Sequence, residues 1–250
     1  MLIALKSRDL KAKESEIAAA VTRGAEELGI KLPRGAGAAF GTYYDFLEQR
    51  GRDVNLTSIY GEENVVRFHF FDSLALLMMY DFKRTRVIDV GSGAGFPGVP
   101  IKIAEPSVDL TLLDATGKRV EFLSELCALL GISARCIHDR AEELAHLADM
   151  RERYDVALSR GVAQLSVLCE LCLPFVCVGG VFIAMKSTDT QEEIEEAQGA
   201  ITELGATQEE CIDYLLPGTN VFHRAVLIRK IEKTPDKYPR RFARIKNDPL

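Results

Sequence analysis

Three glycines that follow a buried acidic strand are the residues of this chain best suited to bind a ligand. An apolar run ends at Val90 and is followed by Gly91, Gly93 and Gly95. Glycine lets a backbone turn sharply and approach a ligand closely. A helix expected over residues 99–104 would point its N-terminus at that ligand. This order of strand, glycine loop and helix predicts a site for the nucleotide-like part of a cofactor, with a tight structural turn as the alternative.

A second acidic strand end supports the cofactor interpretation. A glycine loop alone is a weak signal, and it needs an acidic residue about 20 positions further on. The apolar run over residues 108–113 ends at Asp114. A carboxylate at this place can accept hydrogen bonds from both hydroxyls of a ribose. We therefore predict a nucleotide-containing cofactor at the loop.

Polar residues also stand where other expected strands end. Ala141 and Glu142 follow the third strand, Arg160 ends the fourth, and Lys186 ends the fifth. Ligands of an open parallel sheet bind at the carboxyl ends of its strands, so all four are candidates. For Ala141 and Glu142 the equally weighted alternative is the first turn of a short helix, where acidic residues are favourable. For Lys186 the alternative is a solvated strand end.

Alternating strands and helices must position these residues. Strands are expected over residues 87–90, 110–113, 134–137, 154–158, 180–185, 210–215 and 223–231. The helical patterns between them predict an α/β fold, with a mostly parallel sheet and helices on both faces. We expect a helical lead-in over residues 1–84, which includes one helix over 62–82, then a core over 85–231 and a basic tail over 232–250.

Composition predicts a folded globular protein of the cytosol. The chain has 250 residues, of which 47% are hydrophobic, and this is enough for one sizeable core. Most of its six cysteines lie in apolar runs, which indicates reduced core thiols and no metal. The first ten residues lack a signal-peptide pattern. The longest apolar stretch, over 165–185, is interrupted by Glu170 and Pro174, so we expect no membrane span.

The charge distribution predicts one RNA-facing segment in an acidic protein. The net charge of −6 argues against a general nucleic-acid binder, yet residues 229–246 carry eight basic and two acidic side chains. Tyr238 and Phe242 lie among them, as suits phosphate contact combined with base stacking. A solvated terminus is the alternative. The candidate phosphate contacts are Lys237, Arg240, Arg241 and Arg244.

Several motifs together resemble those of the glucose-inhibited division protein B family. They are N-L-T at 55–57, H-F-F-D-S-L at 69–74, D-V-G-S-G-A-G-F-P-G at 89–98, K-R at 118–119, R-A-E-E at 140–143, S-R at 159–160 and K-Y-P-R-R at 237–241. The resemblance runs from about residue 40 to the end. It implies a Rossmann-like class I methyltransferase fold and a bacterial enzyme that uses S-adenosylmethionine to methylate N7 of a guanine in small-subunit ribosomal RNA.

The resemblance also implies roles for individual residues. It assigns Gly91, Phe96, Ala141, Glu142 and Arg160 to the cofactor. Three polar residues that interrupt apolar helices become candidates for RNA contact: Asn55, His69 and Asp72. For His69 and Asp72 the alternative is a local hydrogen bond between them. The chain departs from the family pattern at Gly161, at Ser187 and over residues 242–244, and these departures concern substrate docking rather than the cofactor.

The expected chemistry needs no general base. Guanine N7 carries an in-plane lone pair and no proton, so the work left is positioning, with Arg160 and Lys186 as candidates to orient the reactants. Two other functions remain open. A nicotinamide-dependent oxidoreductase shares the glycine loop, although the tight G-x-G-x-G favours the methyl donor, and a non-catalytic RNA-binding protein could keep the fold as a scaffold. We expect a monomer whose partner is small-subunit ribosomal RNA or the small ribosomal subunit.

Overall fold

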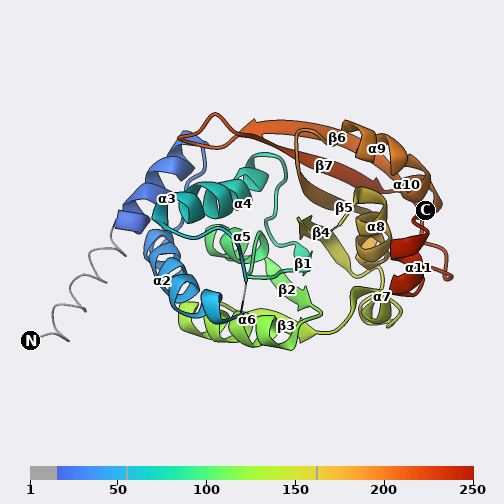
Figure 1. Ribbon diagram of the computed structural model, residues 1–250, viewed down its shortest axis with the longest axis horizontal. Coiled ribbons are helices and arrows are strands. Elements are labelled where there is room, and N and C mark those ends of the chain that lie inside the picture. Colours follow the sequence, from blue (N-terminus) through green and yellow to red (C-terminus); the bar gives the residue numbers. More distant parts are fainter. Residues whose placement is uncertain (1–15, 55, 162) are drawn as a thin grey trace, which may run out of the picture.

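A twisted seven-stranded sheet organises the computed structural model, which describes residues 16–54, 56–161 and 163–250 (Figure 1). The strand order is β3-β2-β1-β4-β5-β7-β6, and β7 is antiparallel to both of its neighbours. The strands are β1 (Arg86–Val90), β2 (Asp109–Asp114), β3 (Ala134–His138), β4 (Tyr154–Arg160), β5 (Val176–Ser187), β6 (Ala206–Leu215) and β7 (Phe222–Lys230). The strand order reverses between β1 and β4, so their carboxyl ends frame the crevice where such sheets bind ligands.

Helices cover both faces of the sheet, as the sequence predicts. One core includes side chains of α2 (Ala36–Val54), α5 (Gly98–Ala104) and α6 (Gly117–Leu130). The other includes those of α7 (Ala141–Leu144), α8 (Leu165–Cys172), α9 (Gln191–Glu196), α10 (Gln198–Glu203) and α11 (Phe242–Asn247). Val87 and Ile88 are neighbours in β1 but belong to different cores, because strand side chains alternate between the faces. The predicted α/β architecture is confirmed.

The prediction of one regular helix over residues 62–82 is wrong. The chain forms α3 (Glu62–Val65), a π-helical segment (Val66–Phe71), α4 (Asp72–Ala75) and a 3₁₀ turn (Leu76–Met78). The Ser73 hydroxyl donates to the His69 carbonyl at 2.6 Å, next to the widened turn. A π-helical turn changes the direction in which side chains leave a helix. Here it lies directly before Asp72 and carries His69, and both residues meet the site described below.

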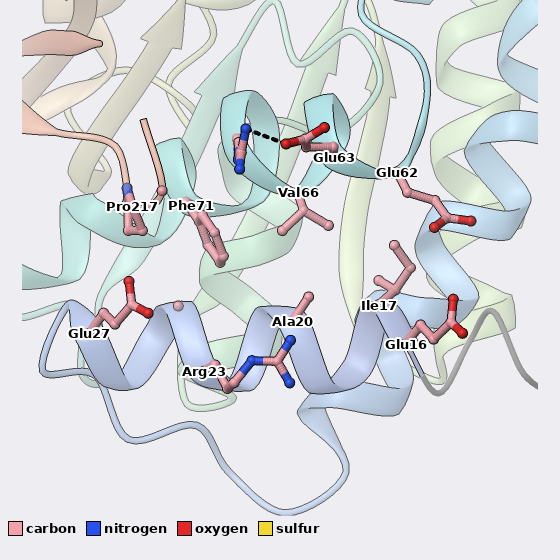
Figure 2. Close-up of a pocket in the computed structure, with 13 residues that line it drawn as sticks. Glu16, Ile17, Ala20, Arg23, Glu27, Glu62, Glu63, Val66, Phe71 and Pro217 are labelled. Atoms are coloured by element: carbon pink, nitrogen blue, oxygen red, sulfur yellow. Dashed lines mark ion pairs between the residues drawn. The ribbon is translucent and has the colours of Figure 1, made fainter. Parts of the chain in front are cut away.

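A groove of about 410 Å³ runs between the first described helix, residues 16–27, and the π-helical segment (Figure 2). Ile17 and Ala20 line it from the helix, and Val66 and Phe71 line it from the opposite side. Pro217, in the turn between β6 and β7, also lines it. The β6–β7 hairpin therefore reaches from the sheet edge to the N-terminal helices. None of the residues predicted for the functional site lines this groove.

Residues 232–250, expected as a basic tail, pack along the core. The Arg151 guanidinium donates to the carbonyls of Thr234 at 2.8 Å and Tyr238 at 2.9 Å. Ile245 of α11 is fully buried in the core cluster that contains α8. The division of the chain at residues 84 and 231 stays a prediction. Among the described residues, no helix combines the length and apolarity needed to cross a membrane.

Candidate cofactor and substrate site

A cavity of about 470 Å³ opens at the carboxyl ends of β1, β2 and β4. Its volume lies within the range of about 300 to 1,000 Å³ that is usual for small-molecule sites. The lining residues are Leu56, Thr57, His69, Gly91, Ser92, Gly93, Ala94, Phe96, Asp114, Ala115, Thr116, Arg119, Arg160 and Gly161. Six of the predicted site residues are thus brought together: Gly91, Gly93, Phe96, Asp114, Arg160 and His69.

The glycines of the loop differ in what they face. Gly91, Gly93 and Gly95 have φ values of 76°, 57° and 102°, a backbone conformation that residues other than glycine rarely adopt. A Cβ on Gly93 would meet only the Gly91 carbonyl oxygen, at 3.9 Å, so the backbone is open to the cavity there. A Cβ on Gly95 would lie 2.7 Å from the Tyr43 hydroxyl. Gly95 therefore permits tight packing behind the loop, and it does not line the cavity.

Asp114 is held rigidly at the end of β2. The carboxylate is 3% exposed and accepts backbone hydrogen bonds from Gly93 at 3.0 Å and Thr116 at 2.9 Å. Arg119 Nη1 lies 3.5 Å from Asp114 Oδ2. A carboxylate has about four lone-pair positions, so this one retains capacity for a ligand hydroxyl. An open glycine backbone bonded to an oriented carboxylate fits the ribose end of a nucleotide-containing cofactor.

Arg160 is fixed by partners from a distant helix. Its Nη1 donates to the Phe68 carbonyl and to Asp72 Oδ2, both at 3.1 Å. Its Nη2 lies 2.8 Å from His69 Nδ1, and its guanidinium carbon sits 5.0 Å from the centroid of the Phe96 ring. The side chain is 17% exposed. His69 and Asp72 therefore hold the arginine at the cavity wall, where Asp72 itself is buried behind it.

The charges of this cluster are set by burial and by each other. Burial, helped by the nearby Arg160 charge, lowers the pKa of His69 to about 3. The imidazole is therefore neutral, with Nδ1 accepting from Arg160 and Nε2 left to donate to the Thr57 hydroxyl 2.9 Å away. Burial raises the pKa of Asp72, but a hydrogen bond from His223 and the Arg160 charge outweigh it and hold that pKa below its usual value.

Stacked rings form the apolar wall of the cavity. The Phe96 ring stacks on His69 with a centroid distance of 4.3 Å and on Tyr43 with 5.1 Å. The Tyr43 hydroxyl donates to the Ala94 carbonyl in the glycine loop at 2.6 Å. The Phe96 ring is therefore fixed between two others, as suits a wall that must hold a ligand in one orientation.

Several predicted residues lie away from the cavity. Ala141 begins α7, and the Glu142 carboxylate is 2.5 Å from Arg140 Nε, which favours the helix-start alternative. Lys186 Nζ donates to the Ala163 carbonyl at 2.7 Å and to Glu193 Oε1 at 2.5 Å, so it ties β5 to α9. Neither the pair nor the lysine lines the cavity. Asn55 lies outside the described residues.

The four residues predicted to contact phosphates differ in their surroundings. Arg240 forms a two-pronged ion pair with the fully buried Glu170, at 2.9 Å and 2.6 Å. Lys237, Arg241 and Arg244 are exposed. Arg240 therefore anchors the segment, while the other three remain accessible.

Other site residues were not singled out from the sequence. Thr57 and Arg119 belong to quoted motifs, and this was a signal that could have placed them in the cavity. Tyr214 and His223, which both contact Asp72, carry no local signal because their partner is more than 140 residues away. Asp89 is fully buried beneath the loop, and its Oδ1 has no hydrogen-bond partner among the described residues. The described chain contains no cluster of three or more metal-ligating side chains.

Comparisons with known proteins show relatives that match over nearly the whole chain. The chain is 43% identical to the ribosomal RNA small subunit methyltransferase G of Alkaliphilus oremlandii, across 91% of this chain and 96% of the relative. It is 42% identical to the protein of that name from Caldanaerobacter subterraneus, across 92% and 97%. The solved structure of YcgJ from Bacillus subtilis matches with a TM-score of 0.50 and 14% identity, across 67% of this chain and 100% of that one.

A sequence model of one protein family matches most of this chain. The fold is the Rossmann-like fold of class I methyltransferases, as the resemblance implies. The family model described as rRNA small subunit methyltransferase G matches residues 37–215, from α2 to the end of β6. The matched range contains the glycine loop, Asp114 and Arg160. This chain belongs to the GidB family, rRNA small subunit methyltransferase G.

Proposed function

We propose that this protein transfers a methyl group from S-adenosylmethionine to N7 of a guanine in small-subunit, 16S, ribosomal RNA. The observation that carries the proposal is the cavity at the carboxyl ends of β1 and β2, where Gly93 is open and bonded to Asp114. Membership of the methyltransferase G family supports the RNA substrate and a place in the cytoplasm, and the relatives' names support the reaction class. The resemblance described above supports N7.

The residues present fit the proposed cofactor. The open backbone at Gly91 and Gly93 admits a close ligand, Asp114 offers acceptors for ribose hydroxyls, and Phe96 supplies an apolar wall. When bound, S-adenosylmethionine supplies an electrophilic methyl group on a sulfonium centre. Arg119 Nη1, 3.5 Å from Asp114 Oδ2, helps to orient that carboxylate.

Arg160 is the residue we assign to orient a reactant. A guanidinium has five N–H donors. Two on Nη1 are directed to Phe68 and Asp72, and one on Nη2 to His69, which leaves Nε–H and one Nη2–H for an acceptor in the cavity. A carboxylate of the cofactor and O6 of guanine are both acceptors that arginine binds well.

The remaining contribution is positioning rather than proton transfer. Guanine N7 needs no deprotonation, and the neutral His69 is already hydrogen bonded on both ring nitrogens. Holding two reactants in line can contribute about 7 to 11 kcal/mol in favourable cases. The pinned Arg160 and the stacked Phe96 are the rigid groups that this requires. Exposed Lys237, Arg241 and Arg244 would contact RNA phosphates.

Binding and transfer together test the proposal. Calorimetry should show binding of S-adenosylmethionine and none of a nicotinamide cofactor, and label should pass from methyl-labelled donor to small-subunit RNA. Binding of the nicotinamide cofactor alone would make the protein an oxidoreductase. RNA binding without label transfer would leave it a non-catalytic scaffold. Either result contradicts the proposal.

A further inference from the structure

Two residues of the β6–β7 hairpin reach the site from the far end of the chain. Tyr214 and His223 are cross-strand partners, with ring centroids 6.2 Å apart and ring planes at 80°. The Tyr214 hydroxyl donates to Asp72 Oδ1 at 2.7 Å, and His223 Nδ1 lies 2.8 Å from the same oxygen. The other oxygen of Asp72 accepts from Arg160. The hairpin and the arginine therefore hold opposite sides of one carboxylate.

We propose that Tyr214 and His223 are positioning residues for Arg160 and act on it through Asp72. The inference rests on the proposed function of Arg160 at the cavity wall. Tyr214 and His223 do not line the cavity, so an effect on a bound ligand has to pass through the residues between them and the ligand. The hydrogen bonds supply this connection in two steps, from hairpin to carboxylate and from carboxylate to guanidinium.

Because a buried carboxylate needs hydrogen-bond donors, the loss of these contacts should change the position or charge of Asp72. Asp72 is 2% exposed, so water cannot replace a lost donor freely. A buried charge is tolerated only when its lone pairs are satisfied. Without the Tyr214 and His223 donors, Oδ1 would be left unpaired, and the carboxylate would have to turn or take up a proton. Either change weakens the hydrogen bond that holds Arg160.

The hairpin is also seated on the helical segment that carries His69. Pro217 of its turn lines the same groove as Phe71, which ends the π-helical segment (Figure 2). A Cβ on Gly218 would lie 3.4 Å from the Arg67 guanidinium of the same segment. The hairpin thus contacts this region at its tip and again at Asp72. It therefore bonds directly to Asp72 and lies against the segment that carries His69.

The test compares hairpin variants with Arg160→Lys. The dissociation constant of S-adenosylmethionine and the KM and kcat for RNA are measured for Arg160→Lys, Tyr214→Phe and His223→Leu. We expect the hairpin variants to change the same constant as Arg160→Lys does, by about 2-fold to 30-fold, the range for residues that act through a neighbour. His223→Asn keeps a donor near the Nδ1 position and should restore most of the loss.

A matched tyrosine provides the control. Tyr154 is buried and its hydroxyl donates to Thr111 at 3.2 Å, at the end of β4 opposite Arg160. Tyr154→Phe should lower stability but leave all three constants unchanged. Combining Tyr214→Phe with Arg160→Lys should add little to the arginine effect, because both changes break one connection.

The outcomes separate the two proposals. If Arg160→Lys changes none of the three constants, the proposed function of Arg160 fails. If Arg160→Lys is impaired while folded Tyr214→Phe and His223→Leu match the wild type, the positioning inference alone is overturned. Fully additive effects in the double variant would overturn it too, since the hairpin would then act independently of Arg160.

Discussion

Gly93 and Gly95 are two residues apart in one loop, but they should respond differently to a side chain. Gly93→Ala places a methyl group in open space next to the cavity, at a φ of 57°. We expect a folded protein that loses about 1 to 2 kcal/mol from the left-handed backbone and binds S-adenosylmethionine more weakly. Gly95→Ala should mainly lower stability because its methyl group would collide with Tyr43. Urea unfolding and calorimetry measure the two effects separately.

Gly131 is the matched control for Gly93. It ends α6 with a φ of 64° and nothing within 4 Å of an added Cβ, and it lies outside the cavity lining. Gly131→Ala should therefore show a similar loss of stability with normal cofactor affinity. Equal affinities for the Gly93 and Gly131 variants would remove the loop from the cofactor site.

Asp89 should give the protein a pH-dependent stability near neutrality. Burial, partly opposed by a hydrogen bond from Gly98, raises the pKa of Asp89 to about 7 from its ordinary value of 3.8. The folded state therefore keeps a proton that the unfolded chain has released, and stability from this group is complete below pH 3.8 and lost as the pH rises through about 7. Between pH 5 and pH 8 the wild type should lose about 3 kcal/mol relative to Asp89→Asn. Parallel unfolding free energies for the two proteins across this range would refute the assignment.

At the residue scale, local chemistry was predictable and distant partners were not. Gly93 and Asp114 could be placed in one site because strand ends meet at one edge of a parallel sheet. The pairing of Asp72 with Tyr214 spans 142 residues and has no signal in either segment. The sequence groups Arg240 with the exposed cations because its partner, Glu170, lies in a helix 70 positions earlier.

At the scale of elements, the C-terminal segment divides into an anchor and an exposed surface. Arg240 is the anchor, since it neutralises Glu170, which is fully buried. Arg240→Ala would leave that carboxylate unpaired and should cost about 3 to 5 kcal/mol of stability. Chemical denaturation measures this loss. A change below about 1 kcal/mol would mean that the pair behaves like a surface ion pair.

The exposed cations of the same segment should act on RNA instead. Lys237, Arg241 and Arg244 have exposed side chains, so replacing all three by Ala should leave folding intact. If they bind phosphates, the slope of log affinity against log salt should flatten by up to about 0.7 to 0.9 for each cation that no longer neutralises a phosphate. Cofactor affinity should not change, because the cavity lies at the strand ends. An unchanged salt slope in the triple variant would return this segment to a solvated terminus.

Strands and helices with a clear pattern of apolar residues were predicted well, whereas local irregularities within them were not. The apolar runs placed every strand of the sheet, because a strand covered on both faces is continuously apolar, as at Val87 and Ile88, which are fully buried in different core clusters. The π-helical turn before Asp72 was missed because most side chains over residues 65–76 are buried, so the sequence has no clear polar face in which a local change of helical period would show. That turn carries His69 and directly precedes Asp72, so the irregular element is the one that serves the site.

At the scale of the whole molecule, two segments that follow the parallel strands pack against different parts of the sheet. The β6–β7 hairpin bonds to Asp72 behind Arg160, and the segment over residues 232–250 packs in the core cluster that contains α8. In Figure 1 the hairpin runs along one edge of the molecule from the N-terminal helices toward the C-terminus. We therefore expect cofactor binding and RNA docking to use different parts of one fold.

The identity of the methylated nucleoside tests the proposed activity most directly. Small-subunit ribosomal RNA that has never been modified is incubated with the protein and methyl-labelled S-adenosylmethionine, then digested to nucleosides and separated. We expect the label in 7-methylguanosine, and its loss with the folded Gly93→Val variant. Label in any other nucleoside would contradict guanine N7 as the acceptor, and an absence of label in RNA would contradict the proposed activity itself.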